Sequence, residues 1–299
     1  MTSLVSRYLG LIRFSHTLFA LPFALATATL AWNRQGFEPL SLVGIVVCLA
    51  MARAAAMAFN RLADRRLDAL NPRTMDRHLP AGQLSVAGVS WFVVATSVGF
   101  VLGTLIFLPL GNWYPLVFCL PVLVWLFGYS YAKRFTSLAH YWLGLALSCA
   151  PVGAWVAIRG PLIWSELAIP SLFAAIVAFW VAGFDIIYAC QDEAFDRQAG
   201  LHSLPSRVGA VWALRLAALS HLIMILAMAA LPLAVPELGA IYWAGWAVIA
   251  ILLGAEHQLV RPNDLRRVNL AFFWINIAVS LGLWLTISLQ LFWNYLKST

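Results

Sequence analysis

The stretch NRLADRRLD places one amide and two carboxylates at intervals of four residues. Asn60, Asp64 and Asp68 would form one stripe along an α-helix, because positions four apart drift by only about 40° per step. Arg53 lies seven residues before Asn60 and falls on the same face. An unpaired arginine inside a membrane would cost a few kcal/mol, so we expect it to have a partner or to face water. The stripe predicts a polar cavity at this end of the helix.

A second acidic stripe follows in DIIYACQDEAFD. Asp185, Asp192 and Asp196 are separated by seven and four residues, which would bring them within about 40° of one another on a continuous helix. Carboxylates that gather in this way repel one another unless a cation offsets their charge. Mg²⁺ prefers a few carboxylates together with phosphate oxygens, and basic residues flank both stripes, so we predict a metal–diphosphate site. The flanking basic residues are Arg61, Arg65, Arg66, Arg73, Arg77, Lys133, Arg134, Arg197 and Arg207.

Other chemistries lack their usual patterns in this sequence. The six histidines and four cysteines are scattered without zinc-type spacing, and neither GxxxxGK[ST] nor GxSxG is present. For Arg65, Arg66 and Arg134 taken singly, charge that hydrates a loop explains their presence as well as substrate contact does. The two acidic stripes have no such simple explanation, because inward-facing charge in a membrane is costly without a function.

The remaining composition is that of an integral membrane protein. Hydrophobic residues make up 63% of 299 and charged residues 10%, against about 25% charged in a soluble domain. A crossing needs about 20 apolar residues, and the apolar segments predict nine helices. The predicted spans are residues 14–33, 40–59, two within 78–132 that PLGNW at 109–113 separates, 135–158, 167–184, 216–236, 238–255 and 268–296. The predicted fold is all-α and polytopic, with two similar four-helix halves plus a ninth helix around a central cavity, in a single domain over residues 1–299.

The basic residues predict the orientation of these helices. If the N-terminus is cytoplasmic, all but three of the 19 Lys and Arg residues lie on or just inside the cytoplasmic face, as do all seven Asp residues. We therefore expect a multi-pass protein of the cell inner (plasma) membrane whose active site faces the cytoplasm. Topology explains the net charge of +7, and no soluble basic domain is present for nucleic-acid binding. The predicted cytoplasmic connections lie near residues 60–85, 132–136, 191–208 and 257–268.

These residues together resemble the UbiA family of intramembrane prenyltransferases. NRLAD followed by RRLD matches the N-x-x-x-D-x-x-x-D signature of the family, and DEAFD matches its second acidic motif. Three further pieces agree: Arg53-Ala-Ala, RHLPAG at 77–82, and the Y-x-x-x-K of Tyr129 to Lys133. The resemblance covers essentially the whole chain. It implies that a polyprenyl group is transferred from polyprenyl diphosphate to the ring of an aromatic acid.

The resemblance also implies the cofactor and the metal ligands. In this family the two acidic motifs bind two Mg²⁺ ions that hold the diphosphate of the donor. Asn60, Asp64 and Asp68 would bind one ion, and Asp192 and Asp196 would bind the other. The second motif here is DEAFD rather than a denser acidic run, so the number of ions at this motif stays open.

Roles for the other site residues follow from the same resemblance. Asp185 matches an Asp that orients the acceptor or takes its proton. Arg13 and Arg53 are the candidates for holding an acceptor carboxylate. Asp185, Lys133 and Tyr129 are the candidate catalytic residues. The residues expected at the diphosphate are Tyr129, Lys133, Arg77 and Arg197.

Two phenolic acids are candidate acceptors, and the resemblance favours 4-hydroxybenzoate. FSHTLFALPFA at 14–24 resembles the 4-hydroxybenzoate polyprenyltransferase-like branch of the family, which implies ubiquinone biosynthesis. Similar openings occur in enzymes of futalosine-route menaquinone synthesis, whose acceptor would be 1,4-dihydroxy-6-naphthoate. A membrane transporter is the alternative of another class, but a carrier needs polar access from both sides and the charge here gathers on one face. The expected partners are the two substrates and the lipid bilayer, with neither nucleic acid nor an obligatory protein partner.

Overall fold

The computed structural model of the chain describes residues 3–13, 17–160, 164–260 and 274–298. The regular structure within these residues is entirely helical, which confirms the predicted all-α class. The chain forms two compact units, each with its own internal packing. Unit 1 contains Met1–Thr17 and Pro39–Tyr131, and unit 2 contains Leu18–Glu38 and Ala132–Thr299. The first acidic stripe belongs to unit 1 and the second to unit 2.

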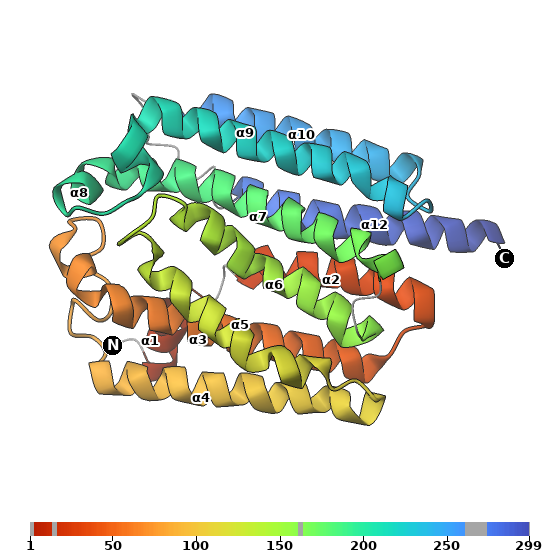
Figure 1. Cartoon of the computed structure of the whole chain (residues 1–299), viewed down its shortest axis with the longest axis horizontal. Coiled ribbons are helices and arrows are strands. Elements are labelled where there is room, and N and C mark those ends of the chain that lie inside the picture. The colour runs from red at the N-terminus through yellow and green to blue at the C-terminus, as the bar shows by residue number, and fades with distance from the viewer. Residues whose placement is uncertain (1–2, 14–16, 161–163, 261–273, 299) are drawn as a thin grey trace. The chain divides into compact units, whose positions relative to one another are not determined.

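Unit 1 is built on one long helix and the helices that pack around it. Its elements are α1 (Leu4–Leu11), α3 (Pro39–Leu70), α4 (Val86–Thr104), the 3₁₀ helix η2 (Leu105–Leu110) and α5 (Tyr114–Ala132). α3 and α4 pack along each other (Figure 1). α3 has 32 residues and is therefore about 48 Å long, whereas the apolar core of a bilayer is about 30 Å thick. Its last turns, which carry the first acidic stripe, thus extend beyond what a membrane crossing requires.

The predicted break at PLGNW is confirmed between α4 and α5. The chain tightens into η2, which contains Pro109, and Gly111 then adopts φ 74°, a conformation that glycine reaches without strain. Asn112 Oδ1 accepts a hydrogen bond from the amide of Tyr114 at 3.1 Å, so the start of α5 is capped. Two helices therefore form within the long uncharged segment, as its length predicted.

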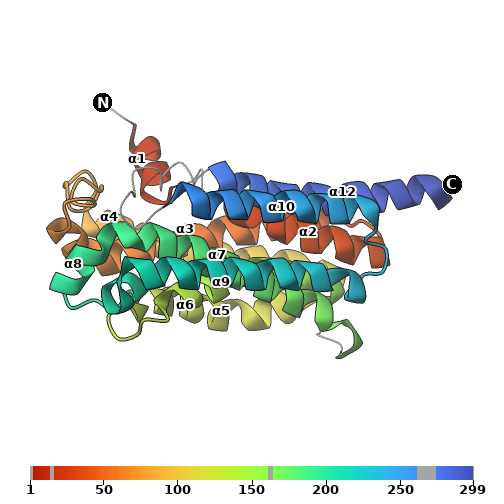
Figure 2. The ribbon, with the colours of Figure 1, turned by 90° about the horizontal axis from the view of Figure 1, so that it is seen from above.

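Unit 2 is layered around α7. α7 packs against both α6 and α9, and α10 packs against α12 (Figures 1 and 2). Thirteen residues of α7 are buried, which suits a helix covered on several sides. The elements of unit 2 are α2 (Thr17–Gln35), α6 (Ala139–Arg159), η3 (Trp164–Glu166), α7 (Ala168–Ala189), η4 (Cys190–Asp192), α8 (Glu193–Gln198), α9 (Leu204–Ala234), α10 (Ala240–Leu259) and α12 (Asn276–Ser298).

Within the described residues, eight helices are long and apolar enough to cross a membrane. α2 is a further helix of 19 residues, close to the predicted first span, so the expected count of nine agrees with the structure. The predicted first and last spans begin at residues 14 and 268, which lie outside the described residues, as does most of the predicted connection 257–268. The eight candidate spans are Pro39–Leu70, Val86–Leu110, Tyr114–Ala132, Ala139–Arg159, Ala168–Gln198, Leu204–Ala234, Ala240–Leu259 and Asn276–Ser298.

The second acidic stripe does not lie on a continuous α-helix, and that prediction was wrong. Asp185 is on α7, Asp192 ends the 3₁₀ turn η4, and Asp196 is on α8. A 3₁₀ helix has about 3.0 residues per turn instead of 3.6, so each residue in η4 rotates about 20° further than it would in an α-helix. The three carboxylates are therefore arranged by a change of helix type, which spacing alone cannot reveal.

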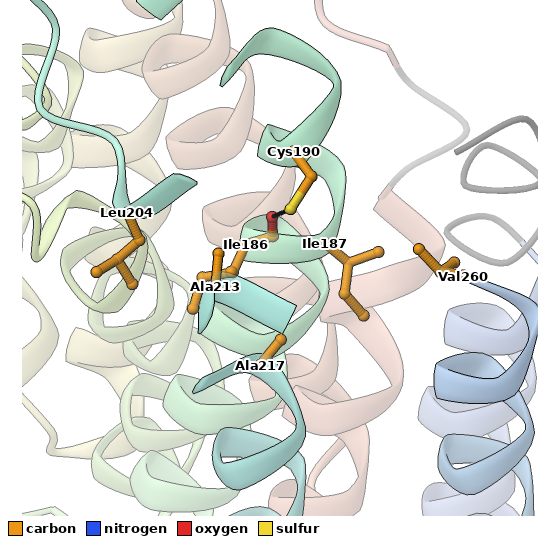
Figure 3. Close-up of a cluster of buried hydrophobic side chains, with 7 residues drawn as sticks. All are labelled: Ile186, Ile187, Cys190, Leu204, Ala213, Ala217 and Val260. Atoms are coloured by element: carbon orange, nitrogen blue, oxygen red, sulfur yellow. Dashed lines mark hydrogen bonds between the residues drawn. The ribbon is translucent and has the colours of Figure 1, made fainter. Parts of the chain in front are cut away.

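An apolar cluster holds the end of α7 against the beginning of α9. Ile186, Ile187 and Cys190 pack with Leu204, which is the first residue of α9 (Figure 3). Cys190 Sγ also donates to the carbonyl of Ile186 at 3.3 Å, the dashed contact in Figure 3. Because closely packed side chains leave little freedom, this cluster fixes the backbone on which Asp185 stands relative to the start of α9. Ala213, Ala217 and Val260 complete the cluster.

Candidate active site

The first acidic group consists of Asn60, Asp64 and Asp68 on the last turns of α3. Asn60 Nδ2 donates to Asp64 Oδ2 at 3.1 Å, as the four-residue spacing predicted. Asp64 and Asp68 are buried, at 5% and 6% exposure. Asp68 Oδ1 accepts a hydrogen bond from Arg77 Nη1 at 2.7 Å, but its buried Oδ2 has no hydrogen-bond partner among the described residues. A buried carboxylate oxygen without a donor is costly, and a bound cation would satisfy it.

The loop that follows α3 returns Arg77 to this group. Asn71 accepts backbone hydrogen bonds from the amides of Thr74 and Met75, both at 2.9 Å, which closes a tight turn. Thr74 Oγ1 donates to the carbonyl of Asp68 at 3.0 Å and ties the turn to the end of the helix. The guanidinium of Arg77 can therefore reach a carboxylate nine residues earlier in the chain.

Further cations and one phenol gather around the first acidic group in unit 1. Arg61 is buried at 9% exposure and interacts electrostatically with Asp68, Arg77, Arg13 and Tyr129. Three residues predicted for the site, Arg13, Arg77 and Tyr129, thus share the surroundings of this one guanidinium. The sequence had offered Arg61 only as one of several nearby bases. Arg61 stands seven residues, or about two helical turns, before Asp68 on α3, which puts the two side chains on the same face.

Arg53 and Arg13, the candidates for an acceptor carboxylate, have defined local structures. Arg53 Nη1 donates to the carbonyl of Ile12 at 3.4 Å, so the expectation that Arg53 has a partner is confirmed. Arg53 also interacts electrostatically with Tyr129. Arg13 adopts φ 44°, and no other non-glycine residue in the described ranges has a positive φ. Such a conformation costs about 1 kcal/mol and is often kept at functional sites, which makes Arg13 notable.

His78 follows Arg77 in the same loop and contributes no charge to the cluster at neutral pH. Burial, and then the positive charges of Arg61 and Arg7, lower the pKa of His78 below its ordinary value. Burial and nearby positive charge both disfavour the protonated imidazole, so His78 is neutral at pH 7. The positive charge beside the first acidic group therefore comes from arginines, which stay protonated at all ordinary pH values.

The second acidic group consists of Asp185, Asp192 and Asp196 in unit 2. Asp196 is buried at 4% exposure, accepts a hydrogen bond from the Ser203 side chain and interacts electrostatically with Lys133 and Asp192. The backbone brings Lys133 to this position, because its carbonyl accepts the amide of His202 at 2.7 Å. Lys133, a predicted diphosphate partner, thus lies beside the second group, whereas Tyr129 of the same Y-x-x-x-K motif lies in unit 1.

Asp185 has a partner that the sequence analysis did not find. His140 Nδ1 lies 2.7 Å from Asp185 Oδ2, while the side chain of Asp185 remains 27% exposed. His140 stands in the first turn of α6, 45 residues away from Asp185. Nothing in its spacing marked it, because the pairing depends on the packing of α6 against α7. It had been counted only among the scattered histidines.

Arg197 is engaged elsewhere in unit 2. Its Nη2 donates to Glu193 Oε1 at 2.9 Å, one turn earlier on α8, and its Nε donates to the carbonyl of Ser206 at 3.4 Å. Its side chain is 62% exposed. Arg197 would have to leave Glu193 in order to bind a diphosphate. Exposed pairs of this kind are worth at most about 1 kcal/mol, so a phosphate would compete with it readily.

The acidic side chains would suit a metal ion for which the protein supplies only part of the coordination shell. Across the described residues, no three His, Cys, Asp or Glu side chains gather into a metal-binding cluster. Mg²⁺ usually binds one or two carboxylates and completes its octahedron with water and substrate phosphates, so it does not require such a cluster. The unpaired Asp68 Oδ2, with Asp64 one turn before it, is a donor set of that kind.

These features agree with a match to known proteins. The model of the UbiA prenyltransferase family matches residues 20–278 of the chain. The chain belongs to the UbiA prenyltransferase family. Prenyl transfer by a helical membrane protein, the coarser part of the predicted function, is thereby confirmed at the level of the family.

Individual relatives align with most of this chain. A 4-hydroxybenzoate octaprenyltransferase from Xanthomonas euvesicatoria pv. vesicatoria (strain 85-10) is 30% identical over 260 residues, which cover 83% of this chain and 81% of that protein. The apo structure of a UbiA homolog from Aeropyrum pernix K1 matches with a TM-score of 0.78 at 29% identity, over 94% of this chain and 98% of that one. A UbiA homolog from Archaeoglobus fulgidus, solved bound to DMAPP and Mg²⁺, matches with a TM-score of 0.66 at 19% identity, over 94% and 99%, and shows a shared fold.

Proposed function

We propose that this UbiA-family chain transfers a polyprenyl group from polyprenyl diphosphate to the ring of 4-hydroxybenzoate, with Mg²⁺ as cofactor. The observation that carries the proposal is the first acidic group, where a buried carboxylate oxygen without a hydrogen bond stands beside arginines. The homolog from Archaeoglobus fulgidus bound to DMAPP and Mg²⁺ supports the donor and the ion. The relative named as a 4-hydroxybenzoate octaprenyltransferase supports the acceptor.

The donor end of the reaction uses the acidic groups and the bases around them. Asn60, Asp64 and Asp68 would hold one Mg²⁺ ion, and Asp192 and Asp196 would hold a second. Such ions would neutralise charge on the leaving diphosphate and so favour breakage of the allylic C–O bond. Arg77, Tyr129 and Lys133 bind diphosphate oxygens, and charge-assisted hydrogen bonds from such groups are about twice as strong as neutral ones.

The acceptor end uses arginines and one carboxylate. A guanidinium has five N–H donors, so the bond from Arg53 to the carbonyl of Ile12 leaves donors for the acceptor carboxylate. Arg13 is the second cation proposed for this role. The ring carbon beside the phenol oxygen attacks the allylic carbon, and Asp185 accepts the proton that this ring carbon loses. The apolar helices exclude water, which would otherwise consume the allylic cation.

Orientation and location are part of the same proposal. The chain lies in the inner membrane with both acidic groups on the cytoplasmic side, where the aromatic acid and the Mg²⁺ ions are available. The strong asymmetry of Lys and Arg between the two faces supports this orientation. The prenyl tail is apolar and can remain in the lipid, which accounts for an enzyme built from membrane helices.

The second candidate acceptor, 1,4-dihydroxy-6-naphthoate, shares the chemistry that the site would recognise. It also joins a phenol to a carboxylate, so the same arginines would hold it. A single assay separates the two acceptors. Purified protein in detergent is given radiolabelled polyprenyl diphosphate and Mg²⁺, with each acid offered separately.

The assay includes Asp64→Ala and a matched control, Asp76→Ala. Asp76 is an exposed carboxylate in the loop after α3, so its removal tests for a general effect of lost negative charge. We expect product from the benzoate, a loss of at least about 100-fold in Asp64→Ala, and less than about twofold change in Asp76→Ala. Product from the naphthoate alone would show that the acceptor is the naphthoate. Full activity in Asp64→Ala or without Mg²⁺ would overturn the enzyme mechanism.

A further inference from the structure

His140 joins three elements of unit 2 through its two ring nitrogens. Nδ1 contacts Asp185 Oδ2 near the end of α7 at 2.7 Å. Nε2 accepts a hydrogen bond from the backbone amide of Leu204, the first residue of α9, at 3.3 Å. The side chain of His140 is 6% exposed, so water does not compete for either contact. The ring on α6 therefore connects Asp185 to the start of α9.

The contact with Leu204 settles which nitrogen carries the ring proton. A backbone amide can only donate, so Nε2 must offer a lone pair and carries no hydrogen. The proton of the ring is then on Nδ1, which donates to the carboxylate of Asp185.

The backbone amide of Leu204 requires an acceptor from outside its own helix. The first four amides of a helix have no partner within the helix, and the residue Leu204 is buried. Ser203 caps the amide of Ser206 at 3.4 Å but leaves that of Leu204 to His140. The apolar cluster of Ile186, Ile187 and Leu204 fixes the two ends that His140 connects (Figure 3).

We propose that His140 is the positioning residue for Asp185: anchored by the amide of Leu204, its ring donates to Oδ2 and directs Oδ1 toward the proton of the acceptor. This inference rests on the proposed function, in which Asp185 takes the proton lost from the aromatic ring. Among the described residues no hydrogen bond occupies Oδ1, and the carboxylate is partly exposed, so one oxygen is held while the other stays available. His140 itself takes no proton in this scheme, because its accepting nitrogen is occupied by Leu204.

Two substitutions separate the two contacts of the ring. In His140→Asn, the side-chain amide nitrogen stands near the place of Nδ1 and can still donate to Asp185. In His140→Gln, the amide reaches the place of Nε2 and can accept from Leu204 but cannot also reach Asp185. We expect His140→Gln to lower kcat for the aromatic product by about 10- to 100-fold with an unchanged KM for polyprenyl diphosphate. His140→Asn should keep most of kcat. His202→Gln removes a ring that contacts Arg207 but keeps the backbone amide that binds the carbonyl of Lys133, so it should match wild type.

A double-mutant cycle distinguishes positioning from general stability. If His140 acts through Asp185, then His140→Gln has little further effect on kcat in an Asp185→Asn background. A purely structural role predicts that the two losses multiply, and this result would overturn the proposal. Equal kcat in wild type and His140→Gln would overturn it as well. Absence of product from wild type with any acceptor would instead refute the proposed function, so the two failures are separable.

A spectroscopic measurement tests the tautomer without turnover. In protein labelled with ¹⁵N-histidine, the His140 signals are identified by their absence from His140→Asn. We expect a proton on Nδ1 and none on Nε2, and the same tautomer in Asp185→Asn, whose side-chain oxygen still accepts. A proton found on Nε2 would contradict the bond to Leu204 and with it the proposal.

Discussion

The two carboxylate oxygens of Asp68 have different surroundings. Oδ1 is held by Arg77, and the buried Oδ2 lacks a donor among the described residues and is available to an ion. Arg77 therefore keeps Asp68 partly neutralised when no ion is bound, and it reduces the negative charge that an ion would meet. In the proposed site Arg77 and Mg²⁺ would act on the same carboxylate, so we expect the binding of the ion to be sensitive to the arginine.

Replacing Arg77 by alanine is expected to have different effects with and without Mg²⁺. Without the ion, Arg77→Ala removes the hydrogen bond to the buried Asp68 carboxylate and should lower the free energy of unfolding by about 1–3 kcal/mol. With Mg²⁺, part of this loss returns, because the ion takes over the carboxylate. The measurement is the melting temperature of purified protein in detergent across a Mg²⁺ titration.

The control for this prediction is Arg66→Ala, which removes an exposed arginine from the same helix. It should change the melting temperature little at any Mg²⁺ concentration. If Mg²⁺ stabilises wild type and Arg77→Ala by the same amount, Asp68 is not a ligand of the ion. A second comparison is the melting temperature of Asp68→Asn with and without Arg77→Ala. The side chain at position 68 in that background is neutral, so it lacks the charge on which both cations would act.

Residue types and spacing predicted much of the site within a single helix. Asn60 and Asp64 pair one turn apart because the geometry of an α-helix is regular and local. The same reasoning could not predict Arg77 against Asp68, which depends on the turns that follow Asn71, nor His140 against Asp185. Those contacts are tertiary contacts between a helix and a loop or between two helices, and sequence spacing does not predict them.

At the scale of the elements, the close approach of α6 and α7 places His140. A Cβ on Gly144 would lie against the backbone carbonyl of Ala178, so only glycine permits the observed separation. Small residues commonly let membrane helices approach in this way. Gly144 stands one helical turn after His140, and the distance between the two helices therefore also sets the distance from His140 to Asp185.

Gly144→Ala is expected to damage both stability and turnover. Overpacking at a buried contact costs about 1–3 kcal/mol, and movement of α6 away from α7 would lengthen the bond from His140 to Asp185. Thermal unfolding in detergent and the rate of prenyl transfer measure the two effects. Gly153→Ala is the matched control on the same helix, because its Cβ would enter open space. Equal behaviour of the two variants would show that the approach of α6 to α7 is not constrained at Gly144.

Helix ends were less predictable than helix interiors. The apolar segment 40–59 predicted a crossing and the spacing of Asn60, Asp64 and Asp68 predicted further helix, but neither gave the end of α3, which lies at Leu70. The run 185–196 was predicted as one stripe, and η4 interrupts it after Ala189. Hydropathy locates the part of a helix that lies in the membrane, whereas the ends depend on caps and on the packing of the neighbouring loop.

At the scale of the whole molecule, composition alone identified the class and most of the helices. An apolar run of about 20 residues has few alternatives to a helix, since every backbone polar group must be paired inside a membrane. The division into two compact units was not foreseen, because it depends on contacts between distant parts of the chain. In unit 2, for example, α2 joins helices that follow it by more than 100 residues.

The proposed orientation gives the last prediction, which concerns the two loops at the ends of α4 in unit 1. Met75 lies in the loop before α4 and Trp113 in the loop after it, at 51% and 54% exposure. In the proposed orientation the first loop is cytoplasmic, so Met75→Cys should react with a membrane-impermeant maleimide only after the membrane is permeabilised. Trp113→Cys should react in cells with an intact inner membrane. Wild type supplies the background, because its four cysteines lie in helices and are buried or half-buried. Labelling of Met75→Cys in intact cells, with protection of Trp113→Cys, would show the opposite orientation. The first acidic group would then lie on the side of the membrane opposite to its proposed substrates.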